Sequence, residues 1–189
     1  MVTIQNDILE VNTDQDAVAH IVLNMKNLPA NVMNADTLSA ISEAVTTVVD
    51  DPGVRGAIFT SARKEFMAGA DLKAVLAFTD RQALFEGITA FNALLRKMET
   101  CGKPFVACLN GSALGGGFEI PLACHYRVAK ETSCCAWASR SKILGLIPRQ
   151  RRGHNACPGC GSEWKIHAIH LQGLMGAATA GSKDTDSRW

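Results

Sequence analysis

The sequence predicts an α/β fold built on a parallel sheet, because short apolar segments of strand character alternate with longer segments of helical periodicity. Strand, loop and helix follow one another twice, first over residues 16–51 and again over residues 54–102. A third strand candidate at residues 103–110 leads into GSALGGGFE, a stretch with four glycines in nine residues. Short strands that are apolar along their whole length are typical of a parallel sheet covered by helices.

The first unit begins with residues 16–25, DAVAHIVLNM, whose β-branched and apolar side chains predict a strand. A loop that contains Asn31 follows, and residues 34–51 then start with an Asn/Asp cap that predicts a helix. A Pro-Gly pair after Asp51 ends this helix. Its apolar side chains recur at helical spacing: Leu38, Ile41, Val45, Val48 and Val49.

The second unit has the same order. Residues 54–61, VRGAIFTS, predict a strand, and ARKEFMAGAD predicts a loop. Residues 80–102 have helical apolar spacing and a glycine stop, and KPFVACLN at residues 103–110 predicts the next strand. ARKEFMAGAD and GSALGGGFE therefore both leave the carboxyl ends of strands, where open α/β sheets hold their ligands.

The composition is that of one globular domain with a substantial core, since 47% of the 189 residues are hydrophobic and 20% are charged. A net charge of +1 indicates neither a nucleic-acid nor a membrane partner. No basic leader precedes an apolar stretch and no window holds about 18 successive apolar residues, so we expect a cytoplasmic protein without a membrane span. Cys101, Cys108 and Cys124 lie in or beside apolar runs, which predicts reduced core thiols.

The chain changes character near Lys130. Residues 1–129 carry 10 Lys and Arg against 14 Asp and Glu, whereas residues 130–189 carry 9 against 4 and hold all three Trp. We therefore divide the chain into a core at residues 1–129 and a divergent tail at residues 130–189.

Two loops of small residues carry the functional hypothesis. Residues 115–117, all glycine, precede an apolar segment expected to begin a helix, so their N–H groups would face a ligand at its positive end. In the other loop, Ala-Gly-Ala at residues 68–70 leaves the amides open, and Asp71 is placed to cap the following LKAVLAF. One N–H from each loop could bind a single oxygen, which describes an oxyanion hole. A tight turn packed against a helix is the alternative interpretation of the same glycines.

FMAGADL and NGSALGGGFEIPLAC resemble, in order and separation, the two signature segments of the enoyl-CoA hydratase/isomerase (crotonase) superfamily. The resemblance runs from about Ile8 to Ala129 and is closest to the hydratase part of the multifunctional fatty-acid oxidation α-subunits. It implies a crotonase-like ββα spiral, an acyl-CoA thioester as partner, and no cofactor beyond the coenzyme A of the substrate.

The resemblance also implies roles for individual residues. The thioester carbonyl would lie between the amides of Ala68 and Gly116, and Glu119 would be the first of two catalytic glutamates. Arg63 would meet the coenzyme A phosphates together with Lys64. The residues expected to contact the substrate are Lys64, Ala68, Gly69, Ala70, Asp71, Gly115 and Gly116, and we expect no metal.

The chain departs from the family pattern in the tail. Hydratases of this family carry a second glutamate about 20 residues after the first, where this chain has Ser139. KILGLIP at residues 142–148 matches the family again, but RQRRGHNACPGCG does not. The family continues with helices that cover the acyl-CoA and build the oligomer interface. We expect these helices to be missing here, which would leave the C-terminal part of the fold incomplete.

Three functions remain open at this point. The first is a hydratase or isomerase of fatty-acid β-oxidation, and the second is a non-catalytic acyl-CoA-binding protein that has lost the second acid. The third takes the tail at face value as a zinc-binding module, with five residues of metal-ligand type: His154, Cys157, Cys160, His167 and His170.

A shifted reading frame would explain the departures in the tail. One choice of codons for the residues from Arg149 onward, read one nucleotide later, gives Gly-Ser-Gly-Gly-Ala-Thr-Thr-Arg-Ala-Arg, which resembles the family's sequence after Pro148. A similar shift turns WASRS into Leu-Gly-Phe-Ala-Glu and supplies an acid near position 139. We predict that nucleotide sequencing across codons 130–189 will find these frames, and codons unrelated to them would contradict the hypothesis.

Overall fold

The computed structural model of the protein describes residues 2–71, 79–129 and 137–138. A six-stranded sheet has the strand order β1-β2-β3-β4-β5-β7, and β6 pairs with β8 in a second, smaller sheet. The strands are β1 (Thr3–Gln5), β2 (Leu9–Thr13), β3 (Val18–Leu23), β4 (Gly56–Ser61), β5 (Phe105–Leu109), β6 (Ala113–Leu114), β7 (Tyr126–Ala129) and β8 (Trp137–Ala138). The helices are α1 (Ala35–Asp50), α3 (Arg81–Thr100) and α4 (Gly116–Ala123).

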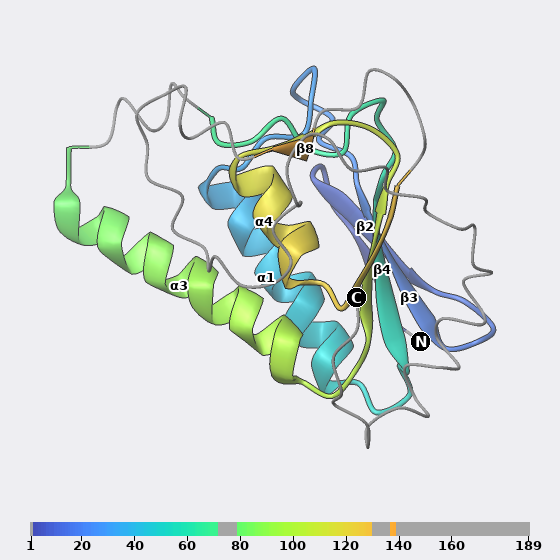
Figure 1. The fold of residues 1–189 in the computed structure, drawn as a ribbon. Helices are drawn as coiled ribbons and strands as arrows, with labels where there is room; N and C mark the ends of the chain where they lie inside the picture. The colour runs from blue at the N-terminus through green and yellow to red at the C-terminus, as the bar shows by residue number, and fades with distance from the viewer. Residues whose placement is uncertain (1, 72–78, 130–136, 139–189) are drawn as a thin grey trace, which may run out of the picture.

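The parallel part of the sheet confirms the predicted units. β3, β4, β5 and β7 pair in parallel and follow one another in space in their chain order. The helices that connect these strands all lie on the same face of the sheet. This is expected when every crossover is right-handed and each new strand is added on the same side of the previous one. Figure 1 shows α1, α3 and α4 on that face, with α3 farthest from the sheet.

At the N-terminus the sheet also contains an antiparallel part, in which β1 pairs with β2 and β2 with β3. These first two strands were not recognised in the sequence, although β2 has the period-two signal of a half-buried strand. Leu9 and Val11 are fully buried, whereas Glu10 and Asn12 point to the other face. The turn after Thr13 is tight, which allows β2 and β3 to form a hairpin rather than a crossover.

The spiral arises because each of the parallel strands β3, β4, β5 and β7 is followed by a short extended segment that belongs to a second ladder. Met33 bridges Ala70 in parallel, Met67 bridges Ala113, and β6 pairs with β8. The chain therefore repeats a strand, a short extended segment and a helix. This second ladder brings the segments around residues 33, 67–70 and 113 together, although they are far apart in the sequence.

The main core lies between the sheet and the helices and is built from fully buried side chains. Phe59 and Phe105 stack with their ring centroids 6.2 Å apart at its centre. Cys101, Cys108 and Cys124 are free thiols, as predicted. Burial raises the pKa of Cys124 to about 12, so this thiol packs as a hydrophobic side chain. In the described part of the chain, no helix has the length and apolar character needed to cross a membrane.

Helix α1 begins and ends with identifiable polar contacts. The Asn34 side chain accepts a hydrogen bond from the Thr37 N–H at 2.9 Å, which confirms the predicted cap. The last turn of α1 carries no basic residue, and Lys103, from the start of the next strand unit, supplies the positive charge. Its Nζ donates to the carbonyl oxygens of Val48 at 2.8 Å and Asp51 at 2.6 Å.

We predict that Lys103→Met lowers the free energy of unfolding by about 1–2 kcal/mol, because two carbonyls at the negative end of α1 lose a charged donor. Urea unfolding followed by circular dichroism measures the change. Arg96→Met is the matched control, since its pair with Glu99 is a surface contact within one helix and its loss should cost at most about 0.5 kcal/mol. Equal losses in the two variants would contradict the capping role of Lys103.

Candidate functional site

The positive end of α4 is open. Gly115 has a φ of 53°, a backbone conformation that favours glycine, and this turns the chain into a helix that starts at Gly116. No side chain caps the helix, and in the described part of the chain the N–H of Gly116 has no acceptor. An unpaired N–H at a helix N-terminus is a binding position for an anion or a developing negative charge.

The two predicted loops lie backbone to backbone, and glycines are the reason they can. A Cβ at Gly111 would lie 2.0 Å from the carbonyl oxygen of Lys64, and a Cβ at Gly117 would lie 2.7 Å from the Cβ of Met67. A Cβ at Gly69, whose φ is 99°, would lie 2.7 Å from the carbonyl oxygen of Leu114. Gly69, Gly111 and Gly117 therefore allow one loop to pack closely against the other.

Gly116 differs from Gly117 in this respect. A Cβ there would meet only Met33 Cγ, at the ordinary contact distance of 3.9 Å. The protein's own packing therefore gives no reason for a glycine at this position. The open N–H and the open space coincide at Gly116, which is consistent with the predicted close approach of a ligand.

In the other loop, the N–H groups of Ala68 and Ala70 differ in whether they have a hydrogen-bond acceptor. The N–H of Ala68 donates to the Asn31 carbonyl at 2.8 Å, so the amide that we expected to bind the thioester oxygen is already paired. The N–H of Ala70 has no acceptor within the described residues. Nothing in Ala-Gly-Ala marks this difference, because it depends on which way each peptide unit faces.

Met33 connects Ala70 with Gly116. It forms a parallel bridge with Ala70, accepting from the Asp71 N–H at 3.0 Å and donating to the Gly69 carbonyl at 2.7 Å. Its side chain also lies against Gly116. Met33 therefore adjoins both Ala70 and Gly116. Sequence reasoning missed Met33, because this residue lies in an irregular loop without a recognisable motif.

Glu119 lies one turn into α4 and is half-buried. Burial raises the pKa of its carboxyl above the ordinary value, because desolvation disfavours the charged form. An exposed first-turn glutamate that only complements the helix dipole would not show this shift. A half-buried carboxyl with a raised pKa, three residues after the open amide of Gly116, is a candidate for proton exchange with a bound molecule.

Arg63 and Lys64, the two basic residues predicted to contact the coenzyme A phosphates, differ in their surroundings. Arg63 donates to the backbone carbonyls of Met25 and Pro29, so its guanidinium ties two loops of the protein together, and its contact with phosphates stays a prediction. Lys64 is exposed, and its role in binding remains a prediction. The helix that Asp71 was expected to cap falls on residues 72–78, outside the described residues.

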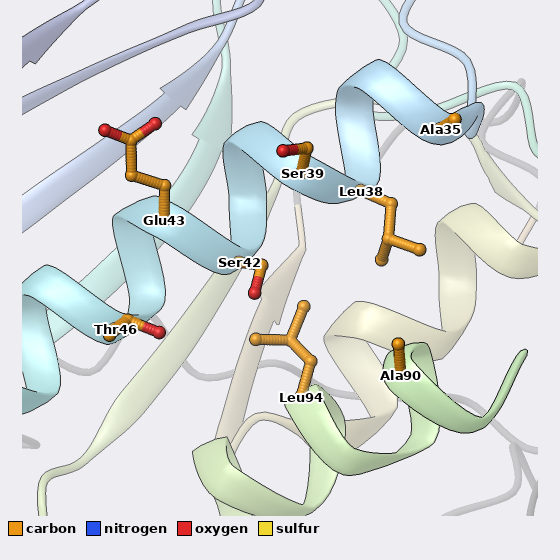
Figure 2. Close-up of a pocket in the computed structure, with 8 residues that line it drawn as sticks. All are labelled: Ala35, Leu38, Ser39, Ser42, Glu43, Thr46, Ala90 and Leu94. Carbon is orange, nitrogen blue, oxygen red and sulfur yellow. The ribbon is translucent and has the colours of Figure 1, made fainter. Parts of the chain in front are cut away.

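A cavity of about 500 Å³ lies between α1 and α3 (Figure 2). Leu38 and Leu94 face each other across it, and Ser39, Ser42 and Glu43 line the α1 side. None of the predicted site residues lines this cavity. It is therefore a groove between two helices, distinct from the site at the start of α4.

The predictions for the tail cannot be compared with the structure, because residues 130–136 and 139–189 lie outside the described part. This applies to Ser139 and to the five possible zinc ligands, His154, Cys157, Cys160, His167 and His170. Over the ranges that the structure does describe, no group of His, Cys, Asp and Glu is arranged to hold a metal ion.

Residues 13–153 match the family model described as enoyl-CoA hydratase/isomerase. The chain is 40% identical over 123 residues to a crotonyl-CoA hydratase of Syntrophomonas wolfei, which covers 62% of this chain and 45% of the relative. It is 32% identical over 126 residues to the fatty acid oxidation complex subunit alpha of a Psychrobacter species, covering 66% of this chain and 18% of that protein. The chain thus spans less than half the length of these curated relatives.

The fold agrees with these sequence matches. A crystal structure of an enoyl-CoA hydratase from Bacillus anthracis superimposes with a TM-score of 0.66 at 28% identity, covering 74% of this chain and 53% of the other. This similarity confirms the predicted ββα spiral. The match to the family model also continues past Lys130, where the composition changes.

We predict opposite behaviour for two adjacent glycine variants. Gly117→Ala should lower the free energy of unfolding by about 1–3 kcal/mol, because its Cβ would overlap Met67 and force the loops apart. Gly116→Ala should fold with wild-type stability or slightly better, since alanine favours the helix and has room. Urea unfolding of both variants measures this, and a destabilised Gly116→Ala would show that Gly116 is needed for packing.

Proposed function

Since the chain belongs to the enoyl-CoA hydratase/isomerase family, we propose that it binds an acyl-CoA thioester with the thioester oxygen at the N-terminus of α4. The donors are the N–H groups of Gly116 and Ala70. The observation that carries the proposal is that these two N–H groups lack acceptors among the described residues. Both residues adjoin Met33, and their loops pack closely against each other at glycines. Ala70 replaces Ala68 in this assignment because the Ala68 amide is paired with Asn31.

Two amides aimed at one carbonyl oxygen stabilise the enolate form of a thioester. The negative charge that develops on the oxygen faces two N–H dipoles and the positive end of α4, and neither has to reorganise. Removal of one such donor costs roughly 3–4 kcal/mol of transition-state stabilisation. An enolate allows either loss of a proton from Cα or addition of water at Cβ, which are the steps of an isomerase and a hydratase.

Glu119 is the proton-transfer group in this proposal. In hydration, its carboxylate takes a proton from water as the oxygen adds to Cβ, and the protonated Glu119 then gives this proton to Cα of the enolate, which restores the carboxylate. The net reaction adds one water across the double bond and requires no cofactor. Because the position of the expected second acid holds Ser139, Glu119 has to act alone or with a group that the sequence does not identify.

A second candidate function follows from the same residue. With serine where the second acid is expected, the chain could bind acyl-CoA thioesters through the two amides without turning them over. Losing one general acid or base typically costs roughly 100-fold to 10,000-fold in rate. Binding of a short enoyl-CoA without any fall in its absorbance would favour this second function.

We predict that Glu119→Gln removes most of the hydration of crotonyl-CoA, measured as the fall in absorbance of the conjugated thioester. The wild-type rate should decline as the pH falls through the pKa of Glu119, because the base must be ionised. Burial places that pKa above the ordinary value, so the decline occurs at a higher pH than for an exposed glutamate. The glutamine variant should lack this limb of the pH profile.

The free energy of unfolding of Glu119→Gln should rise although its hydration rate falls, and this difference provides the control. The ionised, half-buried carboxylate destabilises the folded state at neutral pH, so Glu119→Gln should raise the free energy of unfolding there. The gain should vanish below about pH 4, where the carboxyl is protonated in both states. A variant that is more stable but hydrates as fast as wild type would show that Glu119 is not the base.

A further inference from the structure

Asn31 lies in the loop between β3 and α1 and is fully buried. Its Oδ1 accepts from the Met25 N–H at 3.0 Å, while its Nδ2 donates to Ser61 Oγ at 2.9 Å and to the Phe66 carbonyl at 3.1 Å. The oxygen and the nitrogen of the side-chain amide therefore bind separate segments of the chain. A buried amide with all of these bonds satisfied fixes its neighbours more firmly than apolar packing does.

The backbone of Asn31 binds the same loop as its side chain. Its carbonyl accepts from the Ala68 N–H at 2.8 Å, two residues after the Phe66 carbonyl that its Nδ2 holds. The residue between these two contacts, Met67, bridges Ala113. One residue thus fixes the loop on both sides of the point where it meets the glycine segment before α4.

The Asn31 contacts also decide which amide stays open. Pairing of the Ala68 N–H turns that peptide unit toward Asn31, and Ala70, two residues later in the extended segment, bridges Met33 in the same short ladder. Ser61 supports the arrangement, because its hydroxyl accepts from Asn31 and donates to the Glu65 carbonyl at 2.8 Å. A carboxamide supplies the one acceptor and the two N–H donors that these contacts use, which neither a hydroxyl nor a carboxylate does.

We propose that Asn31 is a positioning residue, which holds the segment 66–68 so that the Ala70 N–H shares one oxygen with the Gly116 N–H. Asn31 does not touch the substrate and acts through the loop. This inference rests on the proposed function, because it assigns a role relative to the proposed donors. It predicts that Asn31 sets the polarisation of a bound thioester carbonyl, and not only the stability of the fold.

The test uses acetoacetyl-CoA, whose enolate absorbs in the near ultraviolet, with the full-length chain. Two N–H donors on the thioester oxygen favour the bound enolate, whereas binding of coenzyme A alone does not use them. Asn31→Ser and Asn31→Asp both remove the amide donors, and Asp keeps the size of the side chain. Each should weaken binding of the enolate roughly 100-fold, as expected for loss of one oxyanion donor, and leave the affinity for coenzyme A unchanged.

Val45→Ala is the matched control, since Val45 is fully buried in α1 and its truncation destabilises the core without touching the loop. It should keep the enolate signal. Retention of the signal by folded Asn31 variants, or its loss in Val45→Ala to the same degree, overturns the positioning role. If both Asn31 variants unfold, Ser61→Ala decides. This variant removes the hydroxyl partner, and a weaker enolate signal supports the role whereas an unchanged signal refutes it.

Failure of the proposed function gives a different result. If the wild-type chain itself binds no enolate of acetoacetyl-CoA, the oxyanion site is refuted, and the inference about Asn31 falls with it. If the wild type forms the enolate and the Asn31 variants form it equally well, only the positioning role is refuted.

Discussion

Contact between two stretches of backbone shapes the candidate site. The segments around residues 64–70 and 111–117 approach closely enough that a Cβ at Gly111 or Gly117 would overlap Lys64 or Met67. This contact joins two successive turns of the spiral through the second ladder. It also places the start of α4 against the loop that follows β4. The direction of the helix, the position of its open amide and the proximity of Ala70 all depend on it.

Helix α4 has different chemistry at its two ends. Its N-terminus has no side-chain cap, whereas its C-terminal carbonyls are bound by Arg127, whose guanidinium donates to Pro121 at 3.1 Å and to Cys124 at 2.8 Å. Pro121 within the helix cannot donate to the helix backbone, so these eight residues rely on packing and on the Arg127 contacts. The protein thus stabilises the end away from the site and leaves the other end available. The desolvated Glu119 adds a cost at neutral pH that a purely structural helix would avoid.

Among the described residues, the buried polar side chains are Asn31, Thr37 and Ser61, and two of them, Asn31 and Ser61, bind the loops of the candidate site. Asn31 and Ser61 bind each other at 2.9 Å, and Asn110 donates to the carbonyl oxygen of Ser61 at 3.1 Å. The end of β4, the loop before α1 and the loop after β5 are therefore connected by hydrogen bonds rather than by apolar contacts alone. Hydrogen bonds have direction, which apolar contacts lack, so they can fix how a peptide unit faces. This property is what an oxyanion site requires of its loops.

The sequence by itself determined the elements whose signals are local. Apolar periodicity and an asparagine cap specify α1, and runs of apolar residues specify β3, β4 and β5. The two loop motifs identified the family, and the helix expected after the glycines begins at Gly116. Tertiary structure alone decided the antiparallel strands at the N-terminus and the choice between Ala68 and Ala70. The reason is physical: both alanines offer the same N–H, and only Asn31, which lies far away in the sequence, pairs with one of them and leaves the other open.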